Sequence, residues 1–251
     1  MSTDPTIHEI LRIMKKLSLL FCSLALITIQ TNAQDALRKF RFGLRAAPQL
    51  TWIKADYKNI PKNETYENGG VKVGFSWGPQ VEIQMNDQFA IQTGVDVNYS
   101  TGKVKGTITT LNTVQTLDQI YKMRFIEIPF GIKARTKEIG YMRYFFNIGL
   151  SAGFRYRANT EFSTSENNQS KVTVSNTNSN AYVNAFRGAY YLGGGVEYSL
   201  SGNTALVGGI VFNNGITNLL KSQNSTNVSN LNFAEERAIL NYLQLNVGIL
   251  F

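Results

Sequence analysis

Eight segments of this chain alternate apolar and polar residues with a period of two, and this pattern constrains the fold more than any other feature. The clearest segment is VKVGFSWGPQVEIQ at residues 71–84, where Val, Phe, Trp and Ile share one face and Lys, Gly, Ser, Gln and Glu share the other. This period is that of a β-strand with differently solvated faces. The other segments are residues 40–53, 88–100, 120–134, 141–157, 186–200, 204–214 and 238–251. The sequence therefore predicts an all-β protein.

The connections between these segments alternate in length. Those at 85–87, 135–140 and 201–203 are short, whereas those at 54–70, 101–119, 158–185 and 215–237 are long and polar. Short turns at one end and long loops at the other are typical of an outer-membrane barrel, whose short turns face the periplasm. We therefore predict an eight-stranded antiparallel up-and-down transmembrane β-barrel with both termini on the periplasmic side.

The chemistry of the two strand faces separates this fold from its competitors. The polar face carries charge at similar depth in strand after strand, which suits a narrow polar lumen, and the bulky aromatic face suits lipid. A soluble lipocalin-like barrel would place the apolar residues inside, and a β-sandwich would not predict the alternating connections. Both remain alternatives. Pro48, Pro79 and Pro129 lie within strands, where each removes a ladder hydrogen bond, and we expect β-bulges there.

Residues 1–33 have the features of a secretory signal peptide. Two lysines follow Met14, then comes the apolar run LSLLFCSLALITI, and small residues precede a cleavage site after Ala33. This run is shorter than the roughly 20 apolar residues that span a bilayer, so we favour a signal peptide over an anchor helix. Residues 1–13 carry no pattern, and we expect Met14 to be the true start. The exported domain is then residues 34–251, located in the outer membrane.

Composition limits the chemistry of this mature domain. The only cysteine and the only histidine, Cys22 and His8, both precede the cleavage site. Disulfides, thiolate or imidazole metal sites and Ser–His or Cys–His catalysis are therefore excluded. Asp96 and Glu127 should face inward at similar depth and could mimic a catalytic carboxylate pair, but the many bases nearby argue against it. We expect no catalytic residues, cofactor or metal. The basic residues behind the net charge of +8 are spread rather than clustered, so we expect no nucleic acid partner.

Charged residues on the inward face form the most informative set. An eight-stranded barrel is about wide enough for side chains to fill it, and desolvated charge persists only when it is paired. We therefore expect a salt-bridged lumen that does not conduct, with Glu197 meeting Arg143 and Glu82 meeting Arg41 or Arg45. A narrow anion-leaning pore is the alternative, because bases outnumber acids. The set comprises Arg41, Arg45, Lys72, Glu82, Asp96, Glu127, Lys133, Arg143, Arg155, Arg157, Arg187 and Glu197.

The outward face offers two further expectations. At the C-terminus, Val247, Ile249 and Phe251 alternate outward and end on an aromatic residue, a pattern that predicts the assembly signal for the barrel-insertion machinery. A simpler alternative is that Phe251 anchors the barrel in the periplasmic aromatic girdle. Lys122 and Arg124 face outward just above the apolar band, where we expect them to meet lipid phosphate. Outer-membrane lipids and lipopolysaccharide are thus expected partners.

A family resemblance adds to this reading. Residues 125–133 read FIEIPFGIK, a Glu-Ile-Pro strand that ends in an inward lysine. Together with Asn32-Ala33-Gln34, the opening strand FRFGLRAAPQLTW and the terminal Phe251, this resembles the PorT-like outer-membrane β-barrel family over roughly residues 38–251. The resemblance implies an eight-stranded outer-membrane barrel. The namesake looks like a component of a protein-secretion system, a role that the resemblance alone does not transfer.

These observations favour a non-enzymatic integral outer-membrane protein with a structural role or an interaction made by its long extracellular loops. Loops as long as 158–185 and 215–237 are usually functional or disordered. The alternatives are a secretion-system component, a narrow pore and a lipid-modifying barrel enzyme that works without histidine. The expected partner of the loops is a secretion-system or extracellular protein.

Overall fold

The computed structural model describes residues 39–57, 64–110, 113–166, 169–180, 183–202, 204–221 and 235–251. Its strands are β1 (Phe40–Tyr57), β2 (Glu64–Asn68), β3 (Lys72–Gln84), β4 (Phe89–Gly94), β5 (Asp96–Thr110), β6 (Thr113–Arg135), β7 (Met142–Glu166), β8 (Gln169–Asn178), β9 (Phe186–Ser201), β10 (Thr204–Gly215) and β11 (Glu235–Leu250). Residues Arg41–Phe251 form one compact unit. The signal peptide expected over residues 1–33 lies outside the described residues. No helix in the described ranges is long and apolar enough to cross a membrane.

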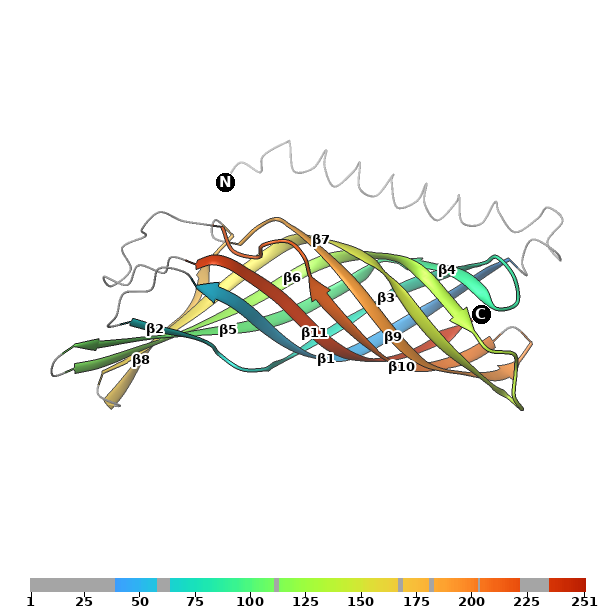
Figure 1. Cartoon of the computed structure of the whole chain (residues 1–251), viewed down its shortest axis with the longest axis horizontal. Helices are drawn as coiled ribbons and strands as arrows, with labels where there is room; N and C mark the ends of the chain where they lie inside the picture. Colours follow the sequence, from blue (N-terminus) through green and yellow to red (C-terminus); the bar gives the residue numbers. More distant parts are fainter. Residues whose placement is uncertain are drawn as a thin grey trace, which may run out of the picture. The chain divides into compact units, whose positions relative to one another are not determined.

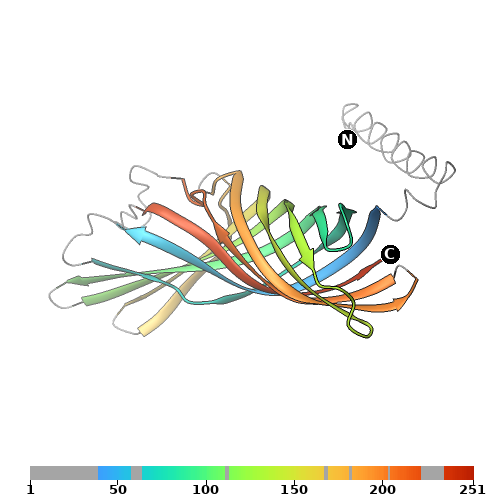
Figure 2. The ribbon, with the colours of Figure 1, turned by 45° about the vertical axis from the view of Figure 1, so that its right-hand side comes forward.

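The sheet closes on itself through its first and last strands. β1 pairs with β11 in antiparallel register, and the ring continues through β10, β9, β7, β6, β4 with β5, and β3 back to β1. β4 and β5 are one strand interrupted at Val95, so eight strands form the ring. Figures 1 and 2 show these strands running obliquely around the barrel. The predicted eight-stranded antiparallel barrel is confirmed.

The side chains of β6 show how the barrel wall is built. Ile126, Ile128, Phe130 and Ile132 are all more than two fifths exposed on the outside, whereas the intervening Glu127 is buried inside. Alternation along a strand sends successive side chains to opposite faces. A wall with apolar residues outside and polar residues inside is the arrangement of a barrel that stands in lipid.

Further along β6 the chemistry of the two faces is reversed, although inward and outward residues continue to alternate in the same phase. Tyr121, Met123 and Phe125 share the inward parity of Glu127 but are buried apolar residues, and the outward residue next to Ile126 is Arg124, which is exposed. An apolar interior with a polar exterior is the arrangement of a water-soluble protein. We call the level between Arg124 and Ile126 the membrane boundary, because the exterior changes from apolar to charged there.

The strands run well past this boundary, further than the sequence predicts. Residues 101–110 and 113–119, which were expected to lie in a loop, are the paired ends of β5 and β6 and keep register as far as Thr110 opposite Thr113. β7 continues to Glu166 with β8 along its edge, and β2 pairs with β5. The strands β2-β5-β6-β7-β8 thus make an outer sheet, drawn at the left of Figure 1. All four expected long loops include strand residues, because even 215–237 contains the end of β10 and the start of β11.

The β-bulges expected at prolines are absent. The register of β1 against β11 is the same on both sides of Pro48, with Ala46 opposite Val247 and Gln49 opposite Gln244. A proline fits an extended strand and removes only one hydrogen bond, so no extra residue is needed. Pro79 instead coincides with the break between β4 and β5, where its carbonyl accepts from Val95 N (3.0 Å).

The bulge in this part of the wall lies elsewhere. Between β6 and β7, the register shifts after Arg124 opposite Arg157, because Phe125 is opposite Arg155. Tyr156 is therefore the extra residue. The third strand proline, Pro129, lies opposite Ser151 in unshifted register.

Inward aromatic rings cover paired glycines in the lower barrel, by which we mean the part nearer the short turns. Gly131 and Gly149 are opposite each other on β6 and β7, and a Cβ at Gly149 would lie 2.7 Å from Cζ of Tyr191. Gly195 and Gly209 form a second pair, where a Cβ on Gly195 would meet the Phe145 ring at 2.8 Å. Glycine is required at these positions because the rings occupy the space of a side chain.

Candidate functional site

A buried charge cluster fills the lumen near the short turns. Lys133 Nζ lies 2.6 Å from Glu82 Oε1 and also binds Glu197, and Arg41 Nη1 is 3.0 Å from Glu197 Oε2 and 3.4 Å from Glu82 Oε2. Arg135 Nη1 approaches the same carboxylates at 3.6 and 3.8 Å. These five side chains come from β1, β3, β6 and β9, so the cluster spans the lumen. The expected contact between Glu82 and Arg41 is present.

The predicted ion pair between Glu197 and Arg143 is wrong. Arg143 is opposite Glu197 in the β7–β9 ladder, but its guanidinium binds Glu138 at 2.7 Å in the neighbouring turn, where both side chains are about one third exposed. Lys133 reaches Glu197 from β6, which lies on the other side of β7, and its Nζ is also 4.2 Å from the Phe145 ring centroid. The carboxylate is thus neutralised by bases that are buried with it, and Arg143 remains near solvent.

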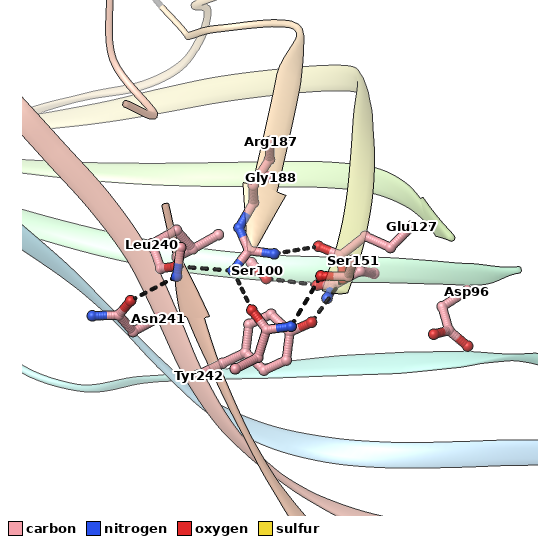
Figure 3. A network of polar contacts seen from close by, with 12 residues as sticks. Asp96, Ser100, Glu127, Ser151, Arg187, Gly188, Leu240, Asn241 and Tyr242 are labelled. Atoms are coloured by element: carbon pink, nitrogen blue, oxygen red, sulfur yellow. Dashed lines mark hydrogen bonds and ion pairs between the residues drawn. The ribbon is translucent and has the colours of Figure 1, made fainter. Parts of the chain in front are cut away.

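A second polar network lies higher in the lumen (Figure 3). Arg187 donates to Glu127 Oε1 (3.0 Å), to Asn213 Oδ1 (2.6 Å) and to the carbonyl of Leu240 (2.9 Å). The Tyr242 hydroxyl donates to the other Glu127 oxygen at 2.7 Å, and the Arg187 guanidinium lies over the Tyr242 ring. Both Glu127 oxygens are therefore occupied, and the carboxylate is buried.

The third charged group is the pair of Arg45 and Asp96, which joins β1 to β5 inside the barrel. Arg45 Nε donates to Asp96 Oδ1 at 2.9 Å, and its Nη2 binds the other carboxylate oxygen. Asp96 is directly opposite Glu127 in the β5–β6 ladder, yet Figure 3 shows Glu127 turned toward Arg187 and Asp96 outside that network. General acid–base catalysis requires a carboxylate that can reach the reacting proton. Each oxygen of these two carboxylates already has a partner that is buried or half-buried with it.

A small cavity lies between these groups. A cavity of about 20 Å³ is bordered by residues of both upper networks, among them Arg45, Asp96 and Glu127. A cavity needs roughly 10–15 Å³ to hold one water molecule. This cavity therefore has room for about a single water molecule.

Above the polar networks, the lumen is closed by an apolar plug. Two connections fold inward there: Val183 forms a β-bridge with Leu220, and Leu219 N donates to the carbonyl of Ala238 at 2.7 Å. The plug consists of Ile53, Val104, Tyr121, Met123, Phe125, Ala158, Val183, Leu219, Leu220, Ala238 and Leu240. The sequence analysis missed it, although the apolar residues at inward positions of β6 were a signal.

The remaining predicted lumen residues are peripheral. Lys72 is half-buried, and none of the ion pairs of the described residues includes it. Arg155 donates to the carbonyls of Asn180 (3.1 Å) and Asn184 (3.3 Å), so it holds the inward connection after β8. Arg157 was expected inside and is exposed on the outside, because the extra residue in β7 reverses the alternation.

Arg135 belongs to the charge cluster but was assigned to a turn in the sequence analysis. It is the last residue of β6, and its side chain is almost completely buried. Over the described part of the chain, no group of three or more His, Cys, Asp or Glu side chains is arranged to hold a metal ion.

A closed barrel with an apolar belt and a filled polar lumen defines an integral β-barrel of the outer membrane. The chain belongs to the outer membrane protein β-barrel domain family, whose model matches residues 30–221. The predicted location in the outer membrane is thereby confirmed. The narrower PorT-like assignment belongs to the proposals below.

Solved outer-membrane barrels resemble the chain at low identity. Neisserial surface protein A is 13% identical with a TM-score of 0.41, and the match covers 84% of this chain and 96% of that one. For Ail of Yersinia pestis the values are 12% and 0.33, with 85% and 99% covered. For OprG of Pseudomonas aeruginosa they are 9% and 0.35, with 84% and 95% covered. No curated protein matches the chain at a significant level.

Proposed function

We propose that this protein is a non-conducting, non-enzymatic outer-membrane barrel that acts through its outer sheet. The observation that carries the proposal is the filling of the lumen by three charged groups and an apolar plug. From this filling of the described lumen we infer that the barrel does not conduct ions. The part of the chain left for recognition is the part outside the barrel.

The outer sheet has two strand edges at which a partner could bind. Its edge strands, β2 and β8, each pair on one side only among the described strands. Unpaired strand edges are sites to which an extended segment of another protein can add. We propose an extracellular protein as the partner of this sheet.

Cross-linking in the native membrane tests this proposal. A photo-reactive residue at Thr109, beside the tip of the β5–β6 hairpin, should capture a partner. A variant in which residues 107–116 are replaced by a two-residue Asn-Gly turn should fold and lose the partner, since Gly106 and Leu117 remain opposite each other to close the shorter hairpin. Capture that maps outside the outer sheet, at the barrel wall or the short turns, would contradict the proposal.

A second candidate is a secretion-system component, as the PorT-like resemblance suggests. The observation that favours it is a polar hollow of about 630 Å³ at the short-turn end, where a periplasmic protein could bind. Its lining residues are Gln84, Asn86, Asp87, Gln88, Thr136, Lys137, Glu138 and Arg143. A photo-reactive residue at Gln88 that captures a secretion subunit, with no capture from Thr109, would establish this candidate instead.

A further inference from the structure

Two arginines face each other on the outer wall. Arg124 on β6 and Arg157 on β7 are direct cross-strand neighbours, and both are exposed. Like charges in directly opposite positions destabilise a sheet. Within the described part of the chain, no ion pair includes either arginine, whereas the nearby Lys122 lies 2.5 Å from Glu161. The two guanidinium groups therefore present concentrated positive charge without a carboxylate between them.

The β-bulge creates this arrangement. Inward positions of β7 below the bulge have odd numbers, as at Asn147 and Ser151, and inward positions above it have even numbers, as at Ala158 and Thr160. Without the extra Tyr156, Arg157 would point into the lumen. Bulges characteristically re-aim a side chain, and this one brings a second arginine beside Arg124.

Two tyrosines lie beside the arginine pair. The Arg124 guanidinium carbon lies 5.4 Å from the centroid of the Tyr99 ring, which is opposite it on β5. The Tyr156 side chain lies within electrostatic reach of Tyr99 and Arg124. Both tyrosines are partly exposed on the outer wall. Aromatic side chains with a polar tip are characteristic of the interface between membrane and water.

The depth of the pair points to one leaflet. About ten residues of β6 separate Arg124 from the short turn, and at roughly 3.3 Å per residue and a tilt of ~45° they span roughly 23 Å, close to the ~25 Å apolar band of such barrels. Because the short turns of these barrels face the periplasm, the pair lies at the head groups of the outer leaflet. Lipopolysaccharide fills that leaflet and carries phosphate on its lipid A.

We propose that Arg124 and Arg157 bind a phosphate group of lipid A, with the Tyr99 ring as the platform under the Arg124 guanidinium. Arginine is suited to this task because its planar fork of N–H donors matches the oxygens of a phosphate. A phosphate between the two side chains also removes their mutual repulsion. This site is independent of the outer sheet and of any partner bound there.

The test compares matched ligands and matched variants of the full-length folded barrel in detergent micelles, with bound lipid counted by native mass spectrometry. The ligands are lipid A, its dephosphorylated form, phosphatidylglycerol and inorganic phosphate. Arg124→Gln and Arg157→Gln should each weaken lipid A binding about tenfold or more, since a charge-assisted bond to phosphate is lost. Lys122→Gln is the control and should leave binding within about twofold, because Glu161 already neutralises this lysine.

Three further results decide the proposal. Wild type should prefer lipid A over its dephosphorylated form, and the double arginine variant should lose that preference. Without lipid A, the single arginine variants should melt at the same or a higher temperature than wild type, because each removes a repulsion. Retention of the preference in the double variant would overturn the proposal. So would equal binding of phosphatidylglycerol or inorganic phosphate, which would identify a general phosphate site.

Discussion

Glu197 lies directly opposite Arg143 in the β7–β9 ladder and yet is neutralised by Lys133, which reaches it from β6. The exposed Arg143 turns to Glu138 instead. Burial explains the choice, since an ion removed from water needs a partner that is removed from water with it. This relationship sets the stability of the lower barrel.

Glu197→Gln should therefore destabilise the barrel strongly. Loss of this carboxylate leaves Arg41, Lys133 and Arg135 sharing Glu82 alone, and breaking a buried pair typically costs about 3–5 kcal/mol. Unfolding in detergent by urea, followed by the gel shift of the folded barrel, measures the loss. Glu138→Gln is the control and should cost at most about 1 kcal/mol, because its pair is exposed. Equal losses in the two variants would contradict this account.

The closed lumen predicts that the wild-type protein shows no steady single-channel conductance in planar bilayers. The double change Leu219→Ser and Leu220→Ser weakens only the apolar plug. It should still not conduct, since the ion pairs below continue to fill the lumen. Steady conductance of the wild type would favour the narrow anion-leaning pore.

Glycine substitution tests the rings that cover the glycine pairs. Gly149→Ala should lower the free energy of unfolding by about 1–3 kcal/mol, because its Cβ would lie 2.4 Å from the carbonyl of Phe130 and against the Tyr191 ring. Gly208→Ala is the matched control, since no atom lies within 4 Å of a Cβ there. Equal unfolding midpoints for the two variants would show that the ring packing carries no stability.

The assembly signal remains a prediction, and the structure supplies a control for it. Phe251 forms two backbone hydrogen bonds with Phe42 at the closing seam, and both aromatic side chains are about half exposed. Phe251→Ala keeps these bonds and should slow insertion into membranes by the insertion machinery. Phe42→Ala should not. If both variants insert at the wild-type rate and lose only stability, Phe251 is simply an interfacial anchor.

The orientation can be checked by labelling single cysteines on intact cells. Thr65→Cys and Thr110→Cys lie in the outer sheet and should react with a reagent that does not cross the membrane. Asn86→Cys, in a short turn, should react only after the outer membrane is opened. The reverse pattern would place the short turns outside and remove the outer-leaflet location of the two arginines.

Period-two alternation was sufficient to predict the ring of strands, because every strand in a membrane barrel must face lipid and lumen in turn. It was insufficient to predict the ion pairs in the lumen, because long side chains such as Lys133 reach partners on strands that are not their neighbours in the sheet. The bulge at Tyr156 leaves no mark in the alternation that could be read in advance. Arg157 was therefore assigned to the wrong face.

The membrane boundary was present in the sequence but was not recognised. Met123 and Phe125 occupy the same parity as Glu127, and a search for polar lumen residues alone passes over them. The outward change from Ile126 to Arg124 is the second half of the same signal. In a barrel that extends beyond the membrane, the strands carry two patterns in succession: apolar residues face outward within the lipid, and apolar residues face inward beyond it.

The membrane boundary between Arg124 and Ile126 determines how deeply the barrel is inserted in the membrane. If the barrel sank by two residues, Arg124 and Arg157 would enter hydrocarbon; if it rose by two, Ile126 and Phe154 would enter water. A mismatch between protein and bilayer thickness carries a free-energy penalty for each ångström. A change in bilayer thickness therefore carries a free-energy cost at this level of the barrel, which tilt of the barrel or local deformation of the membrane reduces.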